Sequence, residues 1–135
     1  EDRFPMKKRI VSLTLALALV FSLSVSASAA ARWDQIDDCN MWLVFSGSTA
    51  LCNVTMTGKV GTSMMRVTVY LQKEKASGGY TNVETWYEEV HGAEFELDQS
   101  VANCSSGNYR LYISARVYDS KGNSEGMTAE TFAKC

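Results

Sequence analysis

Proline, histidine and linker-like segments are almost absent from this sequence. Its 135 residues include one proline and one histidine. Pro5 lies near the start, and neither a low-complexity linker nor a repeat of fixed period follows it. The chain therefore has the length and composition of a single domain with a short leading segment.

Signatures of catalysis are missing as well. No serine occupies a G-x-S-x-G elbow, no glycine-rich phosphate loop is present, and the lone His91 stands beside Gly92 in a predicted loop. The cysteines lack C-x-x-C spacing, which argues against a zinc site. Asp34, Asp37 and Asp38 could ligate calcium, but their spacing does not match an EF-hand loop. We therefore expect no enzymatic activity, no metal and no cofactor.

A membrane-spanning apolar run is also lacking. The apolar stretch at residues 10–23 is 14 residues long, whereas a spanning helix needs about 20. It follows the positive cluster Lys7–Arg9 and is followed by small residues that end in Ala27-Ser28-Ala29. A positive start, a short apolar middle and an A-x-A end indicate a secretory signal peptide, with a membrane anchor as the weaker alternative.

Export would divide the chain into two parts. We expect cleavage after Ala29, with cleavage after Ala31 as a close alternative. Residues 1–29 then hold upstream residues and the signal peptide. Residues 30–135 form the secreted, extracellular domain. The leading part carries four of the 13 basic and two of the 15 acidic residues, so the mature net charge is about −4. An acidic domain does not attract phosphate backbones, so we expect no nucleic-acid partner and, after cleavage, no membrane partner.

Period-two alternation, the pattern of half-buried β-strands, dominates the mature chain. In residues 63–74 the inward positions are Met65, Val67, Val69 and Leu71. In residues 108–119 they are Tyr109, Leu111, Ile113, Ala115 and Val117. Turns rich in glycine, serine and asparagine separate these segments from strands predicted at 39–45, 49–57, 80–90, 93–101 and 124–134.

About seven short strands without a helical stretch predict an all-β fold, an immunoglobulin-like antiparallel two-sheet sandwich preceded by the signal peptide. Named A to G, residues 63–74 are strand C, 80–90 strand D, 108–119 strand F and 124–134 strand G. Tyr109 at the start of strand F has the position of a tyrosine-corner residue. A small open barrel is the structural alternative.

Four cysteines in an exported domain predict disulfides. Cys39 and Cys52 lie on the two arms of the first hairpin, and Cys104 and Cys135 flank the turn at residues 120–123 in a similar way. We expect the pairs Cys39–Cys52 and Cys104–Cys135. The alternative joins Cys52 to Cys104 and Cys39 to Cys135.

One predicted surface is rich in arginine and tyrosine. If strands C and F are neighbours, their outward residues form a single patch, which we call the Arg/Tyr face: Arg66, Tyr70, Arg110, Tyr112, Arg116 and Tyr118. Both residue types are enriched in protein interfaces, although a solvated sheet face would look the same. Trp86 and Tyr87 are consecutive on one strand, so we expect one in the core and the other exposed, where it could stack on a sugar.

The segments CNMWLVFSGSTALCNVTMTGKVGT, MMRVTVYLQKEKASGGYTNVETW and SGNYRLYISARVYDSKGNSEGMTAET follow the leader in this order. With the leader, they resemble a group of small exported proteins of Gram-positive, clostridia-type bacteria over about residues 39–131. The resemblance implies an exported β-sandwich and brings no catalytic residues with it.

From these observations we expect a secreted, non-enzymatic binding module whose Arg/Tyr face contacts an extracellular or cell-surface protein. Two alternatives remain open. One is an exported bacteriocin-like toxin or enzyme inhibitor, and the other is a glycan-binding module.

Overall fold

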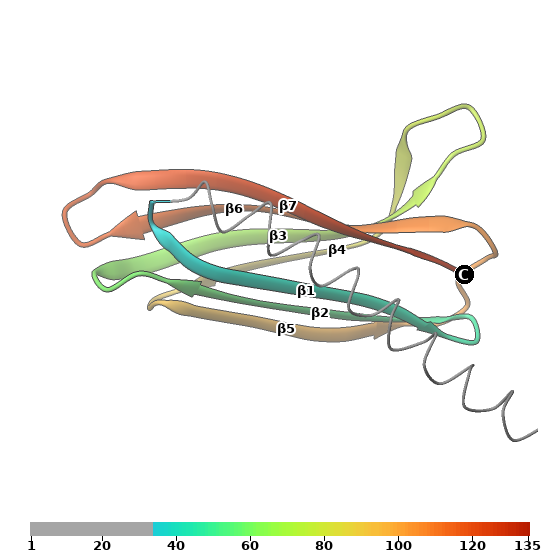
Figure 1. Ribbon diagram of the computed structural model, residues 1–135, viewed down its shortest axis with the longest axis horizontal. Coiled ribbons are helices and arrows are strands. Elements are labelled where there is room, and N and C mark those ends of the chain that lie inside the picture. Colours follow the sequence, from blue (N-terminus) through green and yellow to red (C-terminus); the bar gives the residue numbers. More distant parts are fainter. Residues whose placement is uncertain (1–33) are drawn as a thin grey trace, which may run out of the picture.

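The computed structural model describes residues 34–135, so the predicted signal peptide lies outside the described residues. Seven antiparallel strands form two sheets that face each other (Figure 1). The strands are β1 (Ile36–Ser46), β2 (Thr49–Gly58), β3 (Thr62–Glu74), β4 (Tyr80–Val90), β5 (Glu94–Val101), β6 (Asn108–Asp119) and β7 (Ser124–Lys134). Within this part of the chain, no helix has the length and apolarity needed to cross a membrane.

The order of the strands is immunoglobulin-like. One sheet has the order β1-β2-β5 and the other the order β4-β3-β6-β7. The assignment of residues 80–90 to strand D is wrong, because β4 pairs with β3 and takes the place of strand C′. The cause is the short turn that joins them, where Gly78 and Gly79 both adopt positive φ and fold the chain back on itself.

The alternation predicted for the two central strands is confirmed. Met65, Val67, Val69 and Leu71 of β3 are fully buried, as are Leu111, Ile113 and Val117 of β6. They pack against the inner face of the β1-β2-β5 sheet, which contributes Met41, Leu43, Val54 and Met56. Among residues 34–135 no strand ladder joins the two sheets, so the open-barrel alternative is wrong.

Tyr109 forms the tyrosine corner expected from its position. Its ring is 2% exposed and lies 4.9 Å from the ring of Phe45, measured between centroids. Its hydroxyl donates a hydrogen bond of 2.7 Å to the carbonyl oxygen of Ser105, four residues upstream. This bond fixes the loop before β6 against the core.

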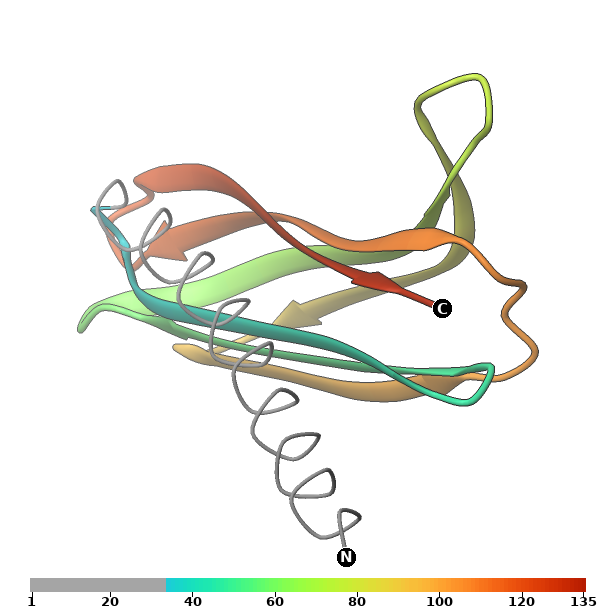
Figure 2. The ribbon, with the colours of Figure 1, turned by 45° about the vertical axis from the view of Figure 1, so that its right-hand side comes forward.

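The hairpin of β3 and β4 projects beyond the sandwich. Its tip stands away from both sheets in Figure 2, where it is the yellow-green loop. The register of the two strands shifts between Leu71 and Gln72, which is where a bulge bends a strand and increases its twist. Side chains at the base of this arm help to hold it to the sheet, as do Lys73 and Glu74 further along, which hydrogen-bond with Ser105 at 2.6 Å and Asn108 at 3.2 Å.

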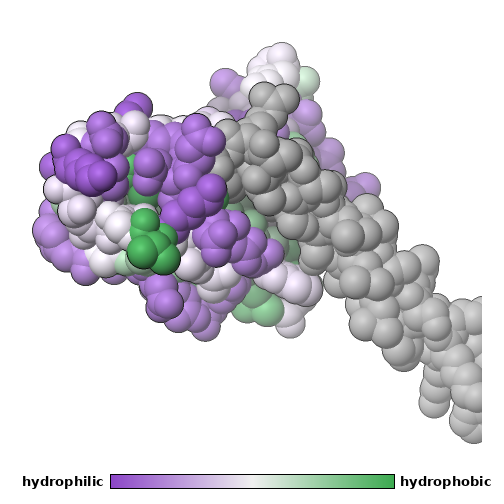
Figure 3. Space-filling model, turned by 60° about the vertical axis from the view of Figure 1, so that its left-hand side comes forward, coloured by the Kyte–Doolittle hydropathy of each residue, from purple (hydrophilic) through white to green (hydrophobic). Residues whose placement is uncertain are grey.

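Polar groups dominate the end of the sandwich that carries the β6–β7 connection. Figure 3 looks towards this end and shows a mostly hydrophilic surface with small, separate hydrophobic areas. The connection itself is ordered by Asp119, whose carboxylate accepts hydrogen bonds from the backbone amides of Lys121 and Asn123 at 2.9 and 2.8 Å. A hydrogen bond from the Asn123 side chain is the main cause that lowers the pKa of Asp119, and the two backbone bonds add to it.

Candidate functional site

The pairing of β3 with β6 brings the predicted Arg/Tyr face together. Arg66 lies opposite Arg116, Tyr70 opposite Tyr112, and Gln72 opposite Arg110. All six predicted residues therefore stand on the outer surface of the four-stranded sheet. The three arginines nevertheless have different surroundings, and these differences decide what the face can do.

Arg110 is held by its neighbours. Its guanidinium lies 3.9 Å from the ring centroid of Tyr80 and 4.8 Å from that of Tyr112. It donates hydrogen bonds to Gln72 at 2.8 Å and to the carboxylate of Glu130 at 2.9 Å, and its side chain is 21% exposed. Arg110 therefore has a structural role at the base of the projecting arm.

Arg66 is exposed but already paired. Its Nε lies 3.2 Å from the carboxylate of Glu89 on β4, and its guanidinium lies 5.5 Å from the ring centroid of Tyr118. The hydrogen bond to Glu89 is the main cause that raises the pKa of Arg66, with smaller contributions from the charges of Tyr118 and Glu89. Glu89 also lies 3.2 Å from Nε2 of His91. The charge of Arg66 is thus largely compensated within the domain.

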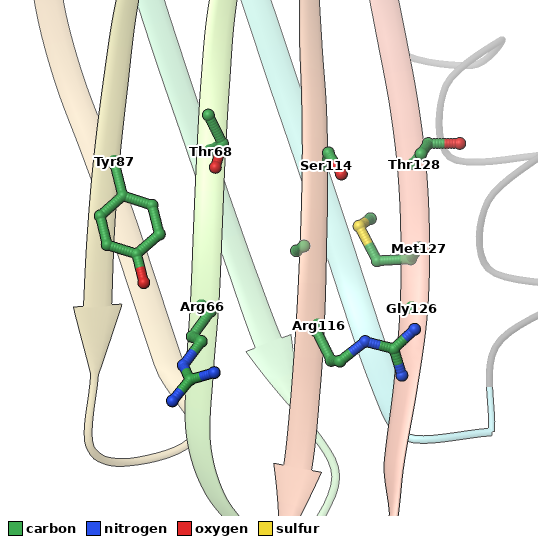
Figure 4. Close-up of a pocket in the computed structure, with 9 residues that line it drawn as sticks. Arg66, Thr68, Tyr87, Ser114, Arg116, Gly126, Met127 and Thr128 are labelled. Atoms are coloured by element: carbon green, nitrogen blue, oxygen red, sulfur yellow. The ribbon is translucent and has the colours of Figure 1, made fainter.

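Arg116 differs from both. No carboxylate within residues 34–135 forms an ion pair with it, and its Nη1 donates a hydrogen bond of 2.9 Å to the hydroxyl of Ser124. The guanidinium extends over Gly126 of the neighbouring strand, as Figure 4 shows. A Cβ at position 126 would lie 2.9 Å from Nη2 of Arg116, so a residue with a side chain would force the guanidinium to shift.

A shallow hollow of about 430 Å³ lies between Arg66 and Arg116. Figure 4 shows the two guanidinium groups pointing in different directions on either side of it. The register aligns Tyr87, Thr68, Ser114 and Thr128 in one row across the four strands. The hollow therefore combines hydroxyl groups with one uncompensated positive charge.

Reasoning from the sequence missed four of the residues that line this hollow: Thr68, Ser114, Gly126 and Thr128. Three of them are small hydroxyl residues, which are common on any solvated strand. The informative signal was Gly126, because a glycine inside a strand often marks a place where another group approaches the backbone closely.

Trp86 and Tyr87 point to opposite faces, as predicted. Trp86 is half-buried against the core, whereas Tyr87 is 62% exposed at the edge of the hollow. Tyr87 is thus the member of the pair that could stack on a ligand.

The predicted bridge between Cys39 and Cys52 is wrong. No disulfide links the four cysteines, all of which lie in the described part of the chain. Cys39 is opposite Met56, four residues along β2 from Cys52. At about 3.3 Å per residue this displacement is about 13 Å, well beyond the roughly 7 Å between Cα atoms that a disulfide can span.

The alternative bridge between Cys39 and Cys135 is also excluded. The sulfur of Cys135 lies 3.8 Å from the carbonyl oxygen of Gly47, at the far end of β1 from Cys39. The same sulfur lies 3.7 Å from the carbonyl oxygen of Cys104.

Burial raises the pKa of Cys52 to about 12, and the charge of nearby Cys104 adds to this effect. Burial likewise raises the pKa of Cys39 to about 12, with Asp38 adding to it, so both thiols are poor nucleophiles.

The three aspartates considered as calcium ligands, Asp34, Asp37 and Asp38, do not form a metal-binding group in the structure. Across residues 34–135, no group of three or more histidine, cysteine, aspartate or glutamate residues is arranged to hold a metal ion. Asp38 instead accepts a hydrogen bond of 2.9 Å from the side chain of Asn40.

Comparisons with protein-family models and with curated proteins find no match for this chain. Among solved structures, the chain is similar to Spo0M, a sporulation control protein from Bacillus subtilis, with 9% sequence identity and a TM-score of 0.36. The match covers 76% of this chain and 51% of the Spo0M chain, so this chain spans about half of that protein.

Proposed function

We propose that this protein is a secreted, non-enzymatic binding module that captures an extracellular or cell-surface protein through the outer face of the β4-β3-β6-β7 sheet. The observation that carries the proposal is Arg116, which forms an ion pair with no carboxylate of residues 34–135 and stands on a face rich in arginine and tyrosine. The charge of this guanidinium favours an acidic partner by charge complementarity.

The experiment measures binding of the labelled, mature domain to intact cells of the source organism. We expect the double variant Arg66→Ser/Arg116→Ser to lose binding, because it removes both arginines that border the hollow. Arg110 is left intact because its contacts are structural. The matched control is Lys59→Ser/Lys121→Ser, which removes the same charge from two exposed turns. Equal binding by both double variants would refute the Arg/Tyr face as the site.

Treatment of the cells identifies the kind of partner. A protein partner requires that binding disappear after mild protease digestion of the cell surface. Binding that survives protease but is lost after periodate oxidation would favour the glycan-binding alternative, and Tyr87→Ala should then abolish it. Killing of cells by the purified domain would favour the toxin.

The secreted form provides a separate test. When the full chain is expressed in a Gram-positive secretion host, we expect the supernatant protein to begin at Ala30 and to carry one disulfide, between Cys104 and Cys135. The structure already holds these two residues close together. Cys135 exchanges backbone hydrogen bonds with Gly107, which lies three residues after Cys104 in the loop before β6.

Intact mass and non-reducing peptide mapping check both points. Cys39 and Cys52 should take up N-ethylmaleimide only after the protein has been unfolded. An uncleaved leader, or a mapped bridge between Cys52 and Cys104, would contradict this prediction.

A further inference from the structure

We propose that the hollow beside Arg116 is a carboxylate subsite that receives an aspartate or glutamate side chain of the partner protein. This inference rests on the proposed function and names the chemistry of its partner. The three arginines differ in their ion pairs. Glu89 pairs with Arg66, and Glu130 pairs with Arg110. Arg116 lacks such a partner within the described residues.

The position of Arg116 is built into the sheet. Gly126 leaves room for the guanidinium, whose Cζ lies 3.5 Å from the place that a Cβ would occupy. The hydrogen bond from Nη1 to Ser124 fixes the group at its other side. A guanidinium has five N–H donors in a planar fork, and this bond leaves others for a ligand. A pre-positioned guanidinium loses little conformational entropy on binding, which favours recognition of a planar carboxylate.

The lining of the hollow supports an amino-acid side chain over a polyanion. Ser114 lies two residues from Arg116 on β6, and its hydroxyl can donate a hydrogen bond to a carboxylate, whereas the hydroxyl of Thr128 points away from both residues in Figure 4. Tyr87, on the opposite side, offers apolar contact to the stem of an acidic side chain. The single uncompensated cation matches a single carboxylate, while the net negative charge of the domain repels highly charged phosphates at longer range.

The test titrates the mature domain with a small probe, N-acetyl-glutamate α-amide, and follows the arginine Nε–H resonances by NMR. Its neutral isostere, N-acetyl-glutamine α-amide, is the matched control. We expect a saturable shift of the Arg116 resonance with the glutamate probe, a much smaller shift of Arg66, and no saturable shift with the glutamine probe.

Two variants separate charge from geometry. Arg116→Gln removes the cation, and Gly126→Ala keeps it but displaces it. We expect each variant to bind the glutamate probe roughly tenfold more weakly, or worse. This loss of affinity corresponds to about one charge-assisted hydrogen bond. Thermal midpoints near that of the wild type would show that both variants are folded, which is expected because both sites are exposed.

An equal response to the two probes, an equal shift of Arg66, or unchanged binding by Gly126→Ala would overturn the subsite. This titration does not involve the cellular partner. The subsite can therefore be refuted while cell binding through the Arg/Tyr face persists. Conversely, saturable binding of the glutamate probe without any cell binding would refute the proposed function alone.

Discussion

Replacing Tyr109 with alanine is expected to lower the free energy of unfolding by about 3 to 5 kcal/mol, as for other large aromatic side chains removed from a core. Such a loss is a large part of the roughly 5 to 15 kcal/mol that stabilises a domain of this size. The ring packs against Phe45, and Nζ of Lys73 lies 6.0 Å from the ring centroid.

The matched control is Tyr109→Phe, which keeps the ring and removes the hydroxyl that bonds to Ser105. We expect this variant to lose about 1 kcal/mol, the net value of one hydrogen bond. Denaturant unfolding monitored by intrinsic fluorescence gives both values. If the two variants are equally stable, packing of the ring does not hold the loop before β6 to the core.

Replacing Arg110 with alanine is expected to destabilise the domain by about 2 kcal/mol, because the guanidinium stacks on two tyrosines and pairs with Glu130. Loss of these contacts should release the projecting β3–β4 arm before the rest of the sheet. Hydrogen exchange should then accelerate in residues 72–83 while the centres of β3 and β6 remain protected.

Two further variants test the cause. Arg110→Lys should recover little, because an ammonium lacks the planar surface that stacks on Tyr80. Arg66→Ala removes an exposed arginine from the same face and should leave stability and exchange almost unchanged. Similar exchange rates in the Arg110→Ala and Arg66→Ala variants would mean that Arg110 does not hold the arm.

The sequence was sufficient to predict the strands and their faces. Met65 to Leu71 and Tyr109 to Val117 alternate so regularly that one face had to be buried. The position of Tyr109 likewise predicted the tyrosine corner. These features depend on local order along one strand, which a sequence displays directly.

Features that depend on cross-strand register were harder to predict. The expected Cys39–Cys52 bridge assumed a hairpin centred near Ser46, whereas the turn lies at Gly47 and Ser48. Moving the centre of a hairpin by two residues moves every partner by four, which is enough to separate the two thiols. For the same reason, the sequence did not reveal that Glu89 and Glu130 compensate two arginines, while Arg116 pairs with no carboxylate in the described part of the chain.

The isolation of Cys39 has a consequence for how the protein must mature. Once β1 has docked, this thiol is sealed in the core and too far from Cys52 and Cys135 to pair with either. In a nascent chain it competes with them for Cys104 and could become trapped in a scrambled species. Folding of small β-sandwiches takes milliseconds to seconds, whereas oxidation of thiols takes seconds to hours. If the chain is exported as proposed, fast folding alone is therefore sufficient to protect it from mispairing.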